Sequence, residues 1–268
     1  MDNNSFDFRK STKAIKELNG WNRDKELEEL EKRKKNDPDF ETVEEFNDKI
    51  IFHLKSNDPS DCGRKLFRKL DLEFEKGITV FVGCNGAGKT TLIRYLTQTL
   101  DRNLIEFYEW SDTKDGRSKG MSRASFYDDL SGLAARMVSS EGENIIINVI
   151  DLIKNINQFI KESEQKNIYI FLDGIDSGLS IDKIINIKED FLHFIQEVYK
   201  DKNFFIFITA NQFELARGEK CFDTKSGKFI EFKTYESFKK FVLKSNTIKE
   251  KELNKLENKR WIMIELYY

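Results

Sequence analysis

The chain has few of the residues that cross-link proteins, bind metals or break helices. Its 268 residues include two prolines, two histidines and three cysteines. Because Cys62, Cys84 and Cys221 are widely spaced and odd in number, they indicate neither a disulfide framework nor a zinc site. No apolar run approaches the roughly 20 residues that span a bilayer, and the N-terminus lacks a basic and then apolar signal segment. We therefore expect a soluble, cytoplasmic protein without a membrane partner.

The chain also lacks an excess of charge of either sign. It has 45 Lys and Arg against 47 Asp and Glu, which gives a formal net charge of −2. Such a balance offers no global argument for binding to nucleic acid or to membranes. Local basic clusters at 64–69 and 114–123 are typical of solvated faces. DNA binding is therefore the less favoured alternative.

The most informative segment that is present runs from Gly83 to Thr91 and reads Gly-Cys-Asn-Gly-Ala-Gly-Lys-Thr-Thr. It follows an apolar, strand-like run and leads into a helix-like one, so it matches a phosphate-binding loop in both pattern and context. Glycines let the backbone N–H groups point at phosphate oxygens, the lysine binds the β- and γ-phosphates, and the first threonine binds Mg²⁺. The residues expected to line this site are Gly83, Asn85, Gly86, Ala87, Gly88, Lys89, Thr90 and Thr91.

Alternating apolar strands and amphipathic helices predict an α/β fold, with a mainly parallel sheet covered by helices on both faces. The expected strands are 66–74, 78–82, 104–108, 168–172 and 204–208, and the expected helices are 22–36, 42–54, 91–96, 125–137, 145–160 and 184–199. Residues 111–123 are expected to form a loop. After the last of these strands and helices, we expect an antiparallel hairpin at 221–232 and two helices at 234–244 and 247–258. We divide the chain into a charged helical extension (1–60), a core (61–212), and a C-terminal hairpin with helices packed on the core (213–268).

A second chemical feature is Asp173, at the carboxyl end of the predicted strand 168–172. In phosphate-loop NTPases an acid at this position anchors Mg²⁺. We therefore expect Thr90 and Asp173 to hold the metal ion.

The segment around Asp173 carries a resemblance to a known family. The run Phe171-Leu-Asp-Gly-Ile-Asp-Ser-Gly-Leu-Ser180 resembles the Walker B and D-loop segment of ABC-type ATPases, particularly their SMC and RecF-like branch. The segment Ser139-Ser-Glu-Gly-Glu143 falls where that family has its Leu-Ser-Gly-Gly-Gln signature, which Ser140 and Gly142 match and Glu141 and Glu143 do not. The same residues are also typical of a helix N-terminus with a capping box. The resemblance covers about residues 66–212.

This resemblance implies a stand-alone ABC-type ATPase head with ATP and Mg²⁺ as cofactors. In that family two heads bind ATP between them: one provides the phosphate loop and the acid, and the other provides the signature, here Ser140, Gly142 and Glu143. The resemblance thus implies an ATP-dependent head-to-tail homodimer. Similar stand-alone heads occur in bacterial mobile elements and anti-phage defence systems beside an effector, so it also implies an effector protein as partner.

Two departures from the family pattern concern catalysis. Gly174 stands where the family has a glutamate that polarises the attacking water, and glycine cannot act as a base. Asp176 is the nearest carboxylate and the candidate substitute. Asn211 stands where a switch histidine is common, and an amide takes no proton at neutral pH. With Lys89 and Asp173 as the other catalytic residues, we expect slow or partner-dependent hydrolysis; a non-hydrolysing ATP-sensing scaffold and an SMC/RecF-like DNA-associated ATPase are the alternatives.

Overall fold

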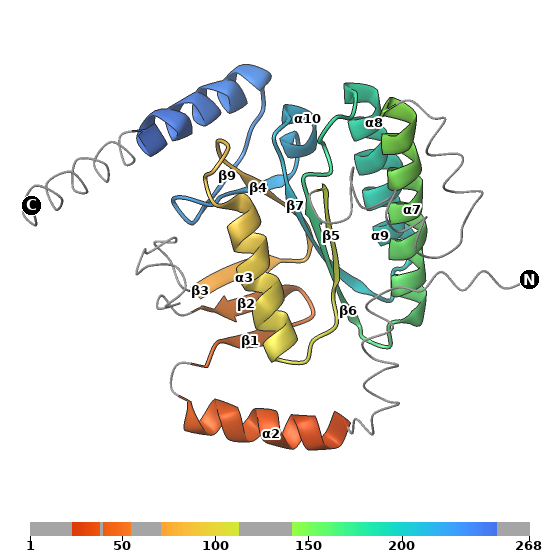
Figure 1. The fold of residues 1–268 in the computed structure, drawn as a ribbon, viewed down its shortest axis with the longest axis vertical. Helices are drawn as coiled ribbons and strands as arrows, with labels where there is room; N and C mark the ends of the chain where they lie inside the picture. The colour runs from red at the N-terminus through yellow and green to blue at the C-terminus, as the bar shows by residue number, and fades with distance from the viewer. Residues whose placement is uncertain (1–22, 38–39, 55–70, 113–140, 251–268) are drawn as a thin grey trace, which may run out of the picture.

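The computed structural model describes residues 23–37, 40–54, 71–112 and 141–250. Its centre is a six-stranded sheet in the order β5-β6-β7-β4-β8-β9, in which only β9 runs antiparallel to its neighbour (Figure 1). These strands are β4 (Gly77–Val82), β5 (Tyr108–Ser111), β6 (Asn167–Asp173), β7 (Asn203–Thr209), β8 (Lys220–Asp223) and β9 (Lys228–Ile230). The expectation of a mixed α/β fold with a mainly parallel sheet is therefore confirmed.

The two faces of this sheet carry different side chains. One face is mainly aliphatic, and it packs against α7 (Glu141–Glu162), α8 (Ile181–Asn186), the π-helical segment η2 (Ile187–His193) and α9 (Phe194–Val198). The other face is mainly aromatic, and it packs against α3 (Lys89–Arg102). Helices thus cover both faces, which explains why β4, β6 and β7 are apolar at nearly every position (Figure 1).

A small antiparallel sheet, β1-β2-β3, packs on the aromatic face. Its strands are β1 (Thr42–Glu45), β2 (Lys49–His53) and β3 (Asp71–Glu75). Phe74 of β3 lies edge-on to Phe207 of β7, with ring centroids 5.1 Å apart, and Phe207 stacks on Phe171 of β6 at 4.8 Å. This aromatic cluster joins the small sheet to the strands that carry the chemical motifs.

The helix expected over 42–54 was wrong, whereas the solvated helix before it is present as α2 (Arg23–Asn36). Residues 42–53 form the hairpin of β1 and β2, closed at Asn47-Asp48 by a bond of 2.9 Å from the Phe46 N–H to the Lys49 carbonyl. The buried residues Ile50, Phe52 and Leu54 recur at every second position, which is the period of a strand. Pairing of β2 with β3 stabilises the strand in place of the expected helix.

Other elements differ from the prediction in their limits. The strand expected at 104–108 begins only at Tyr108, because a turn follows α3 and Leu104 adopts a left-handed conformation with φ 58°. The chain is helical without a break over 235–250, where we expected two helices. The hairpin of β8 and β9 and the strands β4, β6 and β7 agree with the prediction. The helix expected at 125–137 and most of the loop 111–123 lie outside the described residues.

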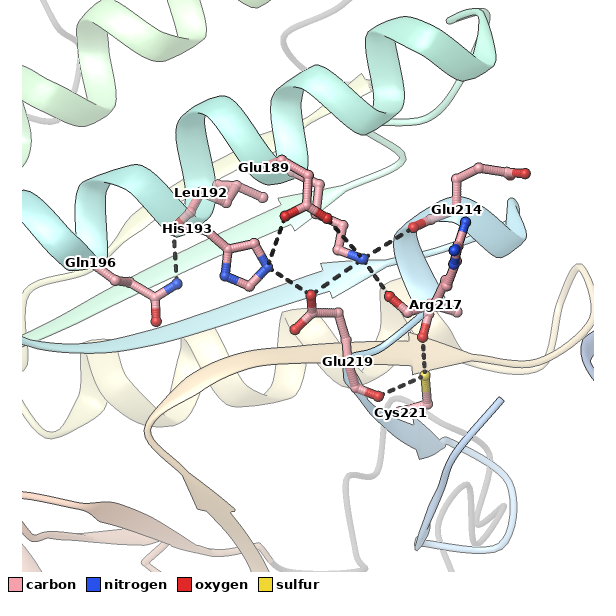
Figure 2. Close-up of polar contacts among 10 residues, drawn as sticks. Glu189, Leu192, His193, Gln196, Glu214, Arg217, Glu219 and Cys221 are labelled. Carbon is pink, nitrogen blue, oxygen red and sulfur yellow. Dashed lines mark hydrogen bonds and ion pairs between the residues drawn. The ribbon is translucent and has the colours of Figure 1, made fainter. Parts of the chain in front are cut away.

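The predicted helix at 184–199 is observed as the continuous series α8, η2 and α9. Lys188, within η2, is buried and donates to the carbonyl of Glu214 at 3.4 Å and to that of Arg217. Its ammonium also lies 3.3 Å from Glu219, whose carboxylate is 2.9 Å from His193 (Figure 2). This network holds the helical layer against the chain segment that links β7 to β8.

In the ranges that the structure describes, no helix is both long and apolar enough to cross a membrane.

Candidate functional site

The loop between β4 and α3 has the shape of a phosphate-binding loop. Gly83 has φ 150°, and a Cβ there would lie 2.7 Å from the Cβ of Ala87. Gly88 has φ 98° and immediately precedes the first turn of α3. Both positions therefore require glycine. The loop delivers its backbone to the N-terminus of a 14-residue helix, where unpaired N–H groups and the helix dipole favour an anion.

Lys89 lies at the start of α3 and is largely buried beneath the loop. Its ammonium donates to the carbonyl of Gly83 at 2.9 Å and to that of Cys84 at 3.3 Å. Burial lowers the pKa of Lys89, while the negative charges of nearby groups, including Asp176 and Asp173, oppose that shift. The cation is thus held inside the curve of the loop, and its contact with the β- and γ-phosphates stays a prediction.

The fold brings together Thr90, in the first turn of α3, and Asp173, the last residue of β6. Strand β4, which leads into α3, is not adjacent to β6 in the sheet. The Thr90 hydroxyl donates to Asp173 Oδ1 at 3.2 Å, and the Thr209 hydroxyl at the end of β7 donates to the same oxygen at 2.8 Å. Asp173 therefore accepts hydrogen bonds from the first turn of α3 and from the end of β7, the strand that lies between β4 and β6. Sequence reasoning missed Thr209, since a single threonine after an apolar strand has no distinguishing pattern.

Asp176 and Asn211 also come together, in a contact between the segments after β6 and β7. Asp176 Oδ2 accepts from the backbone N–H groups of Asn211 at 2.6 Å and Gln212 at 2.8 Å, and Oδ1 accepts from the Asn211 amide at 3.4 Å. Burial raises the pKa of Asp176, and these hydrogen bonds oppose that shift. The geometry makes Asp176 an anchor of the loop after β7; its role in catalysis stays a prediction.

Gly174, which stands where the resemblance would place a glutamate, has φ 74°. Its N–H donates to the Thr209 hydroxyl at 2.8 Å, and a Cβ at this position would lie 3.4 Å from Cβ of Asp112 and 3.3 Å from Oγ of Ser177. A left-handed backbone disfavours a glutamate here. Asp112, which follows β5 directly, thus lies beside Gly174 and was not singled out from the sequence.

The structure describes the expected signature segment only in part. Ser140 is outside the described residues, while Gly142 and Glu143 belong to the first turn of α7. Near the other end of that helix, Phe159 contacts Tyr108 of β5 with ring centroids 5.9 Å apart. Strands β6 and β7 lie between β5 and β4. Strands β5 and β4 are therefore three strand spacings apart, which is about 14 Å.

Residues of the C-terminal part, which had no predicted role, contact the loop. The Thr224 hydroxyl, buried after β8, donates to the carbonyl of Ala87 at 3.2 Å. In the helix over 235–250, Ser245 Oγ accepts from the Cys84 N–H at 3.3 Å, and the Lys249 ammonium donates to the Asn85 carbonyl at 2.8 Å. No motif marks these residues, because their role depends on where the fold places them.

The polar groups at the site suit one class of metal ion. The described residues contain no cluster of three or more His, Cys, Asp or Glu that could hold a metal by itself. Thr90 and Asp173 instead present a hydroxyl and a carboxylate within 3.2 Å of each other. Mg²⁺ suits such a site, since it binds few protein oxygens and takes its remaining ligands from water and phosphate.

Comparison with known families agrees with this geometry. A family model described as an AAA domain matches residues 63–265, well over half of the chain. The chain therefore belongs to this AAA-domain family of P-loop ATPases. Membership implies nucleotide binding, usually with Mg²⁺. Comparison with curated proteins and with solved structures gave no match.

Proposed function

We propose that this protein is an ABC-type ATPase head that binds ATP and Mg²⁺, turns ATP over slowly, and dimerises head to tail to regulate an effector protein. The observation that carries the proposal is the Thr90–Asp173–Thr209 contact, which joins the phosphate loop, β6 and β7 at the carboxyl edge of the sheet. In open parallel sheets ligands bind at this edge. The AAA-domain match supports the nucleotide.

Each part of ATP would have a partner at this site. The backbone amides of loop 83–88 and the start of α3 would bind the phosphates, and Lys89 would offset the charge of the β- and γ-phosphates. Thr90 and Asp173 would hold Mg²⁺, the first directly and the second through water. The metal ion supplies neutralisation of the charge that develops on the phosphate oxygens.

Slow hydrolysis follows from the residues next to Asp173. Gly174 offers no carboxylate, and both oxygens of Asp176 already accept hydrogen bonds. Asn211 can donate to a phosphate or a water but cannot take its proton. The attacking water therefore lacks a dedicated base with a free oxygen at the position that the ABC family uses, which supports slow turnover or a catalytic group supplied by the partner.

The head-to-tail dimer is inferred from the resemblance to ABC-type heads and from the place of α7 beside β5. The start of α7 carries Gly142 and Glu143, and its helix packs beside β5, with β6 and β7 between it and the phosphate loop. In the proposed dimer the two halves of each site would come from different chains. A second copy in the reverse orientation would bring its own Ser140, Gly142 and Glu143 to the γ-phosphate.

The effector is the least constrained part of the proposal, and its basis is the resemblance to stand-alone heads of bacterial mobile elements and anti-phage defence systems. A nucleotide-dependent dimer is a switch, and such a switch would act through the partner that binds one of its two states. A non-hydrolysing ATP-sensing scaffold is the second candidate function, and it is favoured by the left-handed Gly174.

The test is steady-state release of phosphate from ATP and Mg²⁺, together with a direct measurement of ATP binding. We expect turnover on the order of 0.001 per second or less, as in P-loop enzymes that need a catalytic group from a partner. Lys89→Ala should lower it at least tenfold. Binding without turnover would replace the ATPase by the scaffold, and absence of ATP binding by the wild type would refute both.

A further inference from the structure

The helix over 235–250 is fixed to the core on one side and to the phosphate loop on the other. Phe238 contacts Phe213 and Phe232, with ring centroids 5.9 and 5.2 Å apart, and Phe241 lies 5.3 Å from Phe232. Two turns further along, Ser245 is 6% exposed and accepts from the Cys84 N–H. The helix therefore reaches the loop in a defined register.

Lys249 stands one turn after Ser245 on the same side of this helix. Its ammonium donates to the Asn85 carbonyl at 2.8 Å. A Cβ added to Gly86 would lie 2.8 Å from Nζ and 3.2 Å from Cε of this lysine. The ammonium thus lies directly against the backbone at the tip of the loop.

The hydrogen bond to Asn85 leaves most of the hydrogen-bonding capacity of the Lys249 ammonium unused. An ammonium has three N–H donors, and the Asn85 carbonyl uses one. Within the described part of the chain no carboxylate pairs with it; the nearby Glu250 instead accepts from Asn246 at 2.8 Å. Lys249 thus adds a second cation to the loop that binds Lys89 and leads into α3, and these positive groups together favour an anion at the loop.

We propose that Lys249 is a second cationic residue of the nucleotide site, through which the C-terminal helix contacts the phosphates of a nucleotide bound on loop 83–88. The inference rests on the proposed binding of ATP. The two remaining N–H donors of the Lys249 ammonium give charge-assisted bonds to phosphate oxygens. Ser245 and Thr224 hold the backbone of the loop in place. The nucleotide site is then shared between the middle of the chain and its C-terminal part.

The test is the affinity for ATP in the presence of Mg²⁺, measured by titration for Lys249→Met, Lys249→Arg and Lys244→Met. Methionine keeps the length of the side chain and removes its charge, and we expect it to weaken binding about tenfold, as for one charged hydrogen bond. Arginine keeps the charge and should retain most of the affinity. Lys244 is exposed on the same helix, so its variant should bind as the wild type does.

The salt dependence separates a phosphate contact from a purely structural one. The difference between wild type and Lys249→Met should shrink as salt rises, because ions screen charges near the surface. Wild-type affinity in Lys249→Met would overturn the inference, as would a loss of equal size at low and high salt, which would make Lys249 only a support for Asn85. If the wild type binds no better than Lys89→Ala, the proposed function fails instead.

Discussion

At the scale of single residues, the site is built from hydroxyl and carboxylate side chains that each serve more than one partner. Asp173 Oδ1 accepts from two threonines on different elements, and Asp176 Oδ2 accepts from two consecutive backbone N–H groups. Buried acceptors shared in this way fix the loops that carry them. The positions of Gly174 and Asn211 are therefore set by their neighbours before any nucleotide binds.

Cys221 gives a prediction at the same scale. The thiol donates to the Ala216 carbonyl at 3.3 Å, and burial raises its pKa from an ordinary value near 9 to about 12, with Glu219 adding to the shift and Lys188 opposing it. Between pH 9 and 12 the unfolded chain releases a proton that the folded chain keeps. Folding stability from this group is complete below pH 9 and falls as pH rises towards 12.

The measurement is urea unfolding at pH 8 and pH 10.5 for the wild type and Cys221→Ser. The hydroxyl of serine does not titrate in this range, whereas other alkaline groups such as Tyr169 are common to both proteins. We expect the wild type to lose about 2 kcal/mol more than the variant between the two pH values. Equal losses would show that the thiol is as free to ionise in the fold as in the unfolded chain.

At the scale of elements, the network around Lys188 joins the helical layer to the segment that leads into β8 (Figure 2). Lys188→Met keeps the volume of the side chain but leaves Glu219 with His193 alone and removes a donor from two carbonyls. Breaking one side of a buried ion pair costs several kcal/mol. We expect a loss of about 3 kcal/mol in the free energy of unfolding.

Chemical denaturation of Lys188→Met and Lys183→Met measures this effect. Lys183 is exposed in α8, so its variant should stay within about 0.5 kcal/mol of the wild type. A similar small change for both lysines would mean that the network carries no net stability, as is known for some buried ion pairs that can be replaced by apolar residues.

The same scale shows which parts of the fold the sequence could predict. Strands β4, β6 and β7 were predictable, because burial on both faces makes them continuous apolar runs between polar segments. The hairpin over 42–54 was not predictable, because two patterns overlap there. A helical period fits Val43, Phe46 and Ile50, and a strand period fits Ile50, Phe52 and Leu54 equally well. Pairing with β3, which is distant in the sequence, decided between the two.

The candidate site divides in the same way. The phosphate loop and Asp173 were predictable, since their residue types recur at fixed spacing on a strand, a turn and a helix. Thr209, Thr224 and Lys249 were not, because each is an ordinary residue whose function depends on the neighbour that the sheet order and the C-terminal helix provide. Such contacts are determined by tertiary structure rather than by local pattern.

At the scale of the whole molecule, the proposed head-to-tail arrangement makes a prediction that no single-chain site would share. In such a dimer each ATP would lie between the loop of one copy and the α7 start of the other, so Lys89→Ala and Ser140→Ala inactivate different halves of a site. Each variant alone should lose at least tenfold in ATP turnover. In a mixed dimer one of the two sites combines an intact loop with an intact Ser140.

Random mixing of equal amounts would therefore restore about a quarter of the wild-type turnover, since half of the dimers are mixed and each has one complete site. The control is a mixture of Lys89→Ala with the double variant Lys89→Ala/Ser140→Ala, in which no site is complete and no recovery is expected. If the first mixture shows only the mean of its two components, the site is completed within one chain, and the α7 start has another role. Recovery would instead mean that the separation of α7 from the loop by β6 and β7 has a functional reason, because it leaves the signature residues to serve the neighbouring copy.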